Sequence, residues 1–227
     1  MVETIHRFFW GCLVNVNLEI LSSAYLLAEK NIDTVHIKEL VPQMLVRRRL
    51  TKASKIAVKL LAMVEHFENG RIICGSAFGE LETTASILNA IKEDVAISPT
   101  DFQNSVYNTA VSYLSILNHN ENELLTLSSG DKTSLNVLKA GALKAMDGDI
   151  LLLICLETLD IPHIEQVNHC ITYLESGVAL VVKMTSKPAT FRVEKSDMKG
   201  IPRSMSEMLY VAIQSKMRDS AIVEVSL

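Results

Sequence analysis

Several patterns that would assign a protein to a class are missing from this sequence. The four cysteines include no CxxC pair, and the longest basic run is Arg47, Arg48 and Arg49. Because the net charge is −4, the chain lacks the cationic surface with which dedicated nucleic-acid-binding and membrane-surface proteins meet phosphate groups. Four scattered cysteines in 227 residues do not form the framework of a secreted disulfide-rich protein, and they favour a reducing compartment.

Long apolar segments and flexible linkers are also lacking. The opening residues, MVETIHRFFWGCLV, carry an early acidic residue, and their apolar run is too short for a signal peptide or a membrane-spanning helix. No stretch rich in proline, glycine or serine divides the chain, and no repeat is visible. We therefore expect a cytoplasmic protein without membrane insertion, folded as a single domain over residues 1–227.

The most regular part of the sequence, residues 98–157, alternates helix, strand, helix and strand. The start signal SPTD at residues 98–101 precedes a helix whose apolar face is formed by Phe102, Val106, Ala110, Tyr113 and Leu117. Leu124–Leu127 predicts a short buried strand, and a second helix extends from Leu135 to Ala145. Residues 150–155 are continuously apolar, as in a strand covered by helices on both faces. The order predicts a mostly parallel sheet in an α/β fold.

The remaining elements follow from apolar periodicity and turn residues. Strands are predicted at residues 14–20, 71–76, 177–182, 190–193 and 221–225. Helices are predicted at residues 53–64, 81–91 and 205–217. The pattern is irregular between residues 158 and 175.

Four sequence motifs occur in an order, and at intervals, that match a known family. They are MLxRRRL from Met44, GSAFGEL from Gly75, SPTxF followed by SVYN up to Asn108, and SSGD from Ser128. Together they resemble the short β-ketoacyl synthase-like N-terminal family, also called chain-length-factor-like, of the thiolase-fold superfamily. This family occurs in bacterial fatty-acid and aryl-polyene-type polyketide gene clusters. The resemblance covers residues 42–182 and implies the N-terminal half of a thiolase-like α/β fold, a mostly parallel mixed sheet sandwiched by helices.

The same resemblance implies that catalysis is lost. In a complete ketosynthase, the strand matching Leu124–Leu127 runs along the dimer interface and ends at the nucleophilic cysteine. Here that position falls on or beside Ser129, far in sequence from every cysteine, and the second half that supplies two histidines is missing. The histidine of the family's SVHN piece is Tyr107 here. Asp131 adds a negative charge at the helix start, which disfavours an anionic nucleophile.

Each candidate site residue also has an ordinary structural interpretation. Ser128, Ser129, Gly130 and Asp131 could form an acyl-handling turn or a simple turn with a helix cap. Tyr107 and Asn108 could line a residual pocket or lie at a packing boundary.

The glycine-rich piece and the arginine run have two interpretations each. The piece containing Gly75, Gly79 and Glu80 could be a phosphate-binding loop, but it lacks the GxGxxG pattern, which favours a tight turn. Arg47, Arg48 and Arg49 could contact an acyl carrier protein or form a solvated helix start.

We expect no metal and no cofactor. His163, His169 and Cys170 have a spacing that weakly suggests zinc, but no second ligand cluster accompanies them. The Asp147–Gly148–Asp149 piece lacks the further oxygen ligands that calcium requires and favours a turn.

Two functions remain open. The first is a non-catalytic ketosynthase-like subunit of a bacterial fatty-acid or aryl-polyene-type polyketide pathway. It would form a homo- or hetero-oligomer with a β-ketoacyl synthase, through Leu124–Leu127 and the preceding helix, or dock an acyl carrier protein. The alternative is a small acyltransferase or hydrolase that handles acyl thioesters through Ser129, although the sequence contains no GxSxG elbow and no recognisable base.

Overall fold

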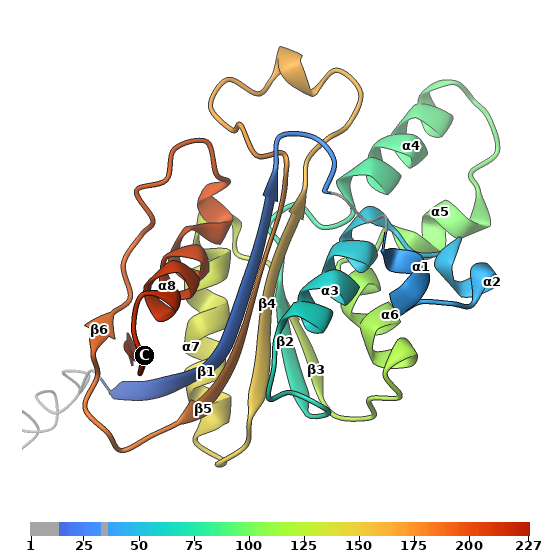
Figure 1. The fold of residues 1–227 in the computed structure, drawn as a ribbon. Helices are drawn as coiled ribbons and strands as arrows, with labels where there is room; N and C mark the ends of the chain where they lie inside the picture. Colours follow the sequence, from blue (N-terminus) through green and yellow to red (C-terminus); the bar gives the residue numbers. More distant parts are fainter. Residues whose placement is uncertain (1–13, 33–35) are drawn as a thin grey trace, which may run out of the picture.

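The computed structural model describes residues 14–32 and 36–227, which form a seven-stranded sheet flanked by helices (Figure 1). In chain order the strands are β1 (Asn15–Ala28), β2 (Arg71–Gly75), β3 (Leu124–Leu127), β4 (Leu151–Thr158), β5 (Glu175–Met184), β6 (Phe191–Arg192) and β7 (Ile222–Ser226). The helices are α1 (Ile37–Leu40), α2 (Met44–Arg47), α3 (Lys52–Met63), α4 (Leu81–Lys92), α5 (Pro99–Asn104), α6 (Thr109–Leu117), α7 (Thr133–Ala145) and α8 (Ser206–Lys216). Short 3-10 turns are η1 (Gly130–Lys132), η2 (Ile164–Gln166) and η3 (Arg203–Met205).

The sheet is more evenly mixed than the mostly parallel sheet that the sequence predicts. Its order is β3-β2-β4-β5-β1-β7-β6. The pairs β3–β2, β2–β4 and β7–β6 are parallel, whereas β4–β5, β5–β1 and β1–β7 are antiparallel. The reason lies in residues 159–174, which connect β4 to β5 without an α-helix. Parallel neighbours usually need a helical crossover, so the chain returns antiparallel here.

Helices cover both faces of the sheet, as the sequence predicts. Helices α3 and α6 lie on one face, and α7 and α8 lie on the other (Figure 1). All eight residues of β4 are buried between these layers, which confirms the interpretation of its continuous apolar run. The strand β1 confirms the period-two pattern up to Ile20, since Val16, Leu18 and Ile20 are buried and their neighbours are not. After a bulge between Ile20 and Ser22 the strand continues to Ala28 without that alternation.

Two predictions in the central region need correction. The helix expected from residue 98 to 117 is divided into α5 and α6 by a turn, so Phe102 is 70% exposed and does not share a buried face with Ala110. Its start is as expected, because Ser98 Oγ accepts a hydrogen bond from the Asp101 N–H at 3.3 Å. The strand β3 is not fully buried: it is the edge of the sheet, and its four residues are half-buried.

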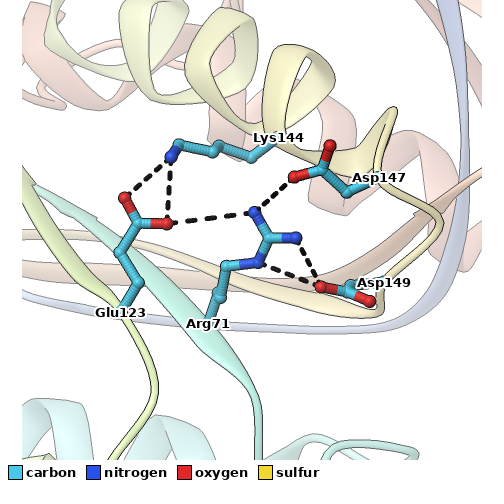
Figure 2. A network of polar contacts seen from close by, with 5 residues as sticks. All are labelled: Arg71, Glu123, Lys144, Asp147 and Asp149. Carbon is cyan, nitrogen blue, oxygen red and sulfur yellow. Dashed lines mark hydrogen bonds and ion pairs between the residues drawn. The ribbon is translucent and has the colours of Figure 1, made fainter.

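A network of charged side chains joins the N-terminal ends of the three parallel strands (Figure 2). Arg71, the first residue of β2, contacts Asp147 at 2.8 Å and donates its Nε–H to Asp149 at 3.0 Å. Glu123, directly before β3, lies 2.7 Å from Lys144 of α7. The two aspartates, which border the turn before β4, thus bind a guanidinium group in this structure.

Candidate functional site

Several predicted site residues meet at the C-terminal ends of β2, β3 and β4, around the loop that follows Gly75. The carbonyl oxygen of Ala77 accepts hydrogen bonds from Tyr107 Oη at 3.2 Å and from Ser128 Oγ at 3.4 Å. The loop after β2 therefore joins the turn between α5 and α6 to the turn after β3.

Close packing explains both glycines of this loop. A Cβ on Gly75 would lie 2.5 Å from Val137 Cγ2 and 2.8 Å from Thr133 Cγ2, so the end of β2 approaches α7 without room for a side chain. Gly79 has φ of +61°, which favours glycine, and its Cα faces the ring of Tyr107. The glycines thus permit a tight turn that packs against α7 on one side and against the turn between α5 and α6 on the other.

A buried carboxylate that the sequence analysis did not single out holds this turn. Glu157, at the end of β4, is 1% exposed. It accepts hydrogen bonds from the Ala77 N–H at 2.7 Å and the Phe78 N–H at 3.3 Å. Two hydroxyl groups also donate to it, Ser76 Oγ at 3.0 Å and Ser204 Oγ at 2.7 Å. The loop N–H groups that could bind a phosphate are therefore used internally.

Burial dominates the electrostatics of Glu157. Desolvation raises the pKa of this carboxyl group, and the four donors oppose the rise because they stabilise the charged form. The signal in the sequence was a single acidic residue at the end of the apolar run Leu151 to Leu156. A single residue does not form a periodic pattern, so the sequence does not reveal its role. The role becomes visible in the folded chain, where the loop after β2 and the 3-10 turn η3 both contact Glu157.

Glu80, a predicted site residue, is also buried but lies outside the Ala77 cluster. Thr51 Oγ1 donates to Glu80 Oε1 at 2.8 Å, which links the start of α3 to the residue before α4. Burial raises the pKa of Glu80 to about 7, the Thr51 hydrogen bond opposes the rise, and the negative charge of Glu82 adds to it.

The turn after β3 is closed by hydrogen bonds of Thr133, whereas neither Ser129 at the start of η1 nor Lys132 at the start of α7 makes a side-chain capping hydrogen bond, so the predicted helix cap is absent. The Ser129 N–H donates to Thr133 Oγ1 at 3.0 Å, and the same hydroxyl donates to the Gly130 carbonyl at 2.7 Å. Gly130 has φ of +55°. Asp131 lies 3.7 Å from Arg203, with both side chains exposed. Among the described residues, Ser129 Oγ has no hydrogen-bonding partner that could act as a base.

The cysteines within the described residues do not supply a thiolate at this place. Cys74 and Cys155 are buried, and burial raises the pKa of Cys74 to about 12 with a further contribution from Glu157. Burial raises the pKa of Cys155 as well. Cys170 is exposed in the loop between β4 and β5, and Cys12 lies outside the described residues.

The structure places Asn108 and the arginine run in a second region. A groove of about 520 Å³ between α2, α5 and α6 is lined by Arg49, Asn108 and a mixture of apolar and uncharged polar side chains. Arg48 is exposed to solvent. Arg47 donates instead to the carbonyl oxygens of Val41 and Pro42 at 2.8 and 3.2 Å, so it stabilises its own loop. Tyr107 and Asn108 are adjacent in sequence but lie in different regions: Tyr107 contacts the loop after β2, and Asn108 lines the groove.

The described residues contain no group of three or more His, Cys, Asp or Glu side chains arranged to hold a metal ion. His163 adopts a left-handed backbone conformation with φ of 65°, and its ring lies 3.7 Å from Glu165. None of the helices in the described ranges is long and apolar enough to cross a lipid bilayer.

A family comparison defines the class of this protein. The β-ketoacyl synthase N-terminal domain family matches residues 23–220. The chain therefore belongs to this family, and the match extends beyond residues 42–182 on both sides. No curated protein matches the sequence.

Solved structures share the fold. A ketosynthase (ApeO) in complex with its chain length factor (ApeC) from Xenorhabdus doucetiae matches with a TM-score of 0.62 and 23% identity over 84% of this chain and 89% of that chain. The ishigamide ketosynthase/chain length factor matches with a TM-score of 0.60 and 11% identity, over 77% of this chain and 63% of that one. A β-ketoacyl synthase from Burkholderia phymatum STM815 matches with a TM-score of 0.57 and 11% identity, over 75% and 59%. These matches confirm a thiolase-like α/β fold, and this chain spans less than two thirds of the latter two proteins.

Proposed function

We propose that the protein is a non-catalytic ketosynthase-like subunit that pairs with a β-ketoacyl synthase through the open edge of β3. The observation that carries the proposal is that this edge of the sheet has no partner strand among the described residues. Among the described residues, β3 pairs with β2 alone, and its four residues, LLTL, are half-buried. Edge strands are normally protected by charge, proline or a bulge. None of these three occurs within β3, whose one protective feature is its short length of four residues.

The hydrogen-bonding direction of β3 leaves a defined row of groups for a partner strand. The carbonyl oxygens of Glu123 and Leu127 face β2, because they accept from Ile72 and Ser76. Backbone groups alternate along a strand, so those of Leu124 and Thr126 point outward. A strand of another protein could add here, with main-chain hydrogen bonds providing affinity and the half-buried leucines providing apolar contact.

The local chemistry supports a role without catalysis. Ser129 follows β3 where the family resemblance places the nucleophile, yet within the described chain no base contacts its hydroxyl group. A serine hydroxyl is a weak nucleophile without an adjacent base. Nothing in the geometry favours the alternative of an acyltransferase or hydrolase acting through Ser129.

The names of the similar structures support the same assembly, since one is a ketosynthase in complex with its chain length factor. We extend that arrangement to this chain and place it in a bacterial fatty-acid or aryl-polyene-type polyketide pathway, as the resemblance implies. We propose in addition that the protein docks an acyl carrier protein. Its contacts would be Arg48 and Arg49, which are exposed, and not Arg47.

The first test is a capture experiment with the tagged chain, co-expressed with β-ketoacyl synthases encoded in its own genome. We expect a synthase in stoichiometric amount. Thr126→Pro should abolish capture, because it removes an outward N–H group while leaving the β2 pairing intact. Ser129→Ala is the matched control and should capture normally.

Loss of the synthase in both variants, or its retention in Thr126→Pro with an unchanged melting temperature, would contradict pairing through β3. An acyl adduct on the wild-type chain that disappears in Ser129→Ala, detected by intact mass spectrometry, would support the enzymatic alternative instead.

A further inference from the structure

Helix α4 projects from the body of the protein (Figure 1). None of its twelve residues is buried, and it packs against the short helix α5. A helix of this length is marginally stable in water, and most helices gain stability by packing an apolar face. The position of α4 therefore depends strongly on the polar contacts at its ends.

The start of α4 is joined to the start of α3 by two polar contacts. Thr51 Oγ1 donates to Glu80 Oε1 at 2.8 Å, directly before α4. The same oxygen accepts a hydrogen bond from the Ser54 N–H at 3.1 Å and so caps α3. Lys52 Nζ lies 3.5 Å from the carboxylate of Glu82, in the first turn of α4. Two adjacent residues thus hold both carboxyl groups at the start of α4.

The ammonium group of Lys52 is shared with two further carboxylates. It lies 3.7 Å from Glu175 Oε1 and 4.0 Å from Asp160. Glu175 is 3% exposed, and its second oxygen accepts a hydrogen bond from the Ile32 N–H at 2.7 Å. One positive charge therefore serves three negative ones, which come from α4, from the connection after β4 and from the start of β5.

Glu80 is a fourth carboxyl group beside this cluster, and it is 5% exposed. Burial raises its pKa to about 7, the neutral Thr51 hydroxyl group opposes the rise, and the charge of Glu82 adds to it. The thiol of Cys74 in β2 stays neutral, because burial raises its pKa to about 12. The charged and titratable groups around the starts of α3 and α4 are Lys52, Cys74, Glu82, Glu157, Asp160 and Glu175.

We infer that the starts of α3 and α4 form a pH-sensitive latch, which holds α4 against α3 while Glu80 is protonated and releases it when Glu80 ionises. Ionisation adds a negative charge next to Glu82, in a cluster where three carboxylates already share the ammonium group of Lys52. Opening exposes the Glu80 carboxylate to water, which stabilises its charged form.

The loop before the latch has hydrogen bonds of its own. The Ala77 and Phe78 N–H groups donate to Glu157, and the Gly79 N–H donates to Ser76 Oγ at 2.8 Å. Gly79 has φ of +61°, which favours glycine, and it directly precedes Glu80. The movable part therefore begins beside a glycine and leaves the ends of β2 and β3 in place. The inference does not depend on pairing with a ketosynthase.

Amide hydrogen exchange of the full-length chain between about pH 5 and about pH 8 tests the latch, with rates corrected for the intrinsic pH dependence of exchange. The closed state binds a proton more tightly than the open state, so opening becomes easier as the pH rises from about 4.5 to about 7 and then levels off. We expect the protection of residues 81–92 to fall roughly tenfold or more, within a limit of roughly 300-fold that the shift from 4.5 to about 7 sets. Peptides from α7 should keep their protection and serve as the internal reference.

Three variants separate the latch from other titrations. Glu80→Gln keeps an acceptor for Thr51 and should abolish the pH dependence in α4. Glu82→Gln removes the neighbouring negative charge, so the midpoint should move to lower pH. Glu93→Gln, at the exposed far end of α4, makes the same charge change outside the latch and should behave as wild type.

Protection of α4 that does not change with pH would overturn the inference, as would an unchanged pH dependence in Glu80→Gln. A parallel loss of protection in α7 would show unfolding of the whole domain in place of a local opening. A midpoint that is the same in Glu82→Gln, Glu93→Gln and wild type would show that the two carboxyl groups at the start of α4 do not act together. Either of these results would also overturn the inference.

Discussion

The two ends of the parallel strands β2, β3 and β4 are held together in opposite ways. At the N-terminal ends, Arg71 and Lys144 contact three carboxylates near the surface (Figure 2). At the C-terminal ends, the single buried carboxylate of Glu157 accepts four hydrogen bonds from neutral groups. Exposed ion pairs contribute little because water screens them, whereas a buried charge without its partners is costly. The candidate site is built at the end where each contact has the larger energetic consequence.

Removing the buried carboxylate should have the largest effect. Glu157→Ala leaves the buried hydroxyl groups of Ser76 and Ser204 without their acceptor, together with the partly buried N–H groups of Ala77 and Phe78. We expect a loss of roughly 3–5 kcal/mol in the free energy of unfolding. Urea denaturation followed by circular dichroism measures it. Glu157→Gln, which keeps one carbonyl acceptor, should lose less. A loss below about 1 kcal/mol in Glu157→Ala would show that the two ends are energetically alike.

The pH dependence of the free energy of unfolding reports on the buried carboxyl group of Glu80. The pKa of Glu80 is raised to about 7 from its ordinary value of 4.5, so the folded state binds a proton more tightly than the unfolded chain. The free energy of unfolding should therefore fall as the pH rises from about 4.5 to about 7, by roughly 2–3 kcal/mol from this group.

Glu80→Gln isolates that contribution, because the pKa values of Glu157 and Glu175 are also raised by burial and act in the same direction. The difference between wild type and Glu80→Gln should be flat below about pH 4.5, change up to about pH 7, and then level off. A difference that stays constant from pH 4 to 8 would contradict the titration of Glu80 in this range.

The sequence predicted the elements that have strong local signals. The strand β4 followed from continuous apolar residues, and α7 followed from helical spacing. The direction of β5 was missed because it depends on a connection without helical periodicity, residues 159–174. The exposure of α4 was missed for a related reason: its apolar stripe is as regular as that of α3, and only the folded chain shows that none of the described elements buries it.

The candidate site was predicted in part. Gly75, Gly79, Tyr107 and Ser128 do come together, since the loops at the C-terminal ends of neighbouring parallel strands share one edge of the sheet. The side chain that orders them, Glu157, depends on contacts with Ser204, which is 47 positions away in the chain. No local pattern encodes such a contact.

The exposed network should show the smallest effect. Arg71→Gln removes the contacts with Asp147 and Asp149 while keeping a polar side chain. We expect a loss of about 1 kcal/mol in the free energy of unfolding at low salt, the upper end of the range for ion pairs near the surface, because Arg71 contacts Asp149 through two nitrogens and belongs to a network. In 1 M NaCl the loss should largely disappear, since the screening length falls to roughly 3 Å. Lys139→Gln, on the same helix as Lys144 but outside this network, is the matched control for the charge change. A loss above about 3 kcal/mol that persists in high salt would show that the strands depend equally on both ends.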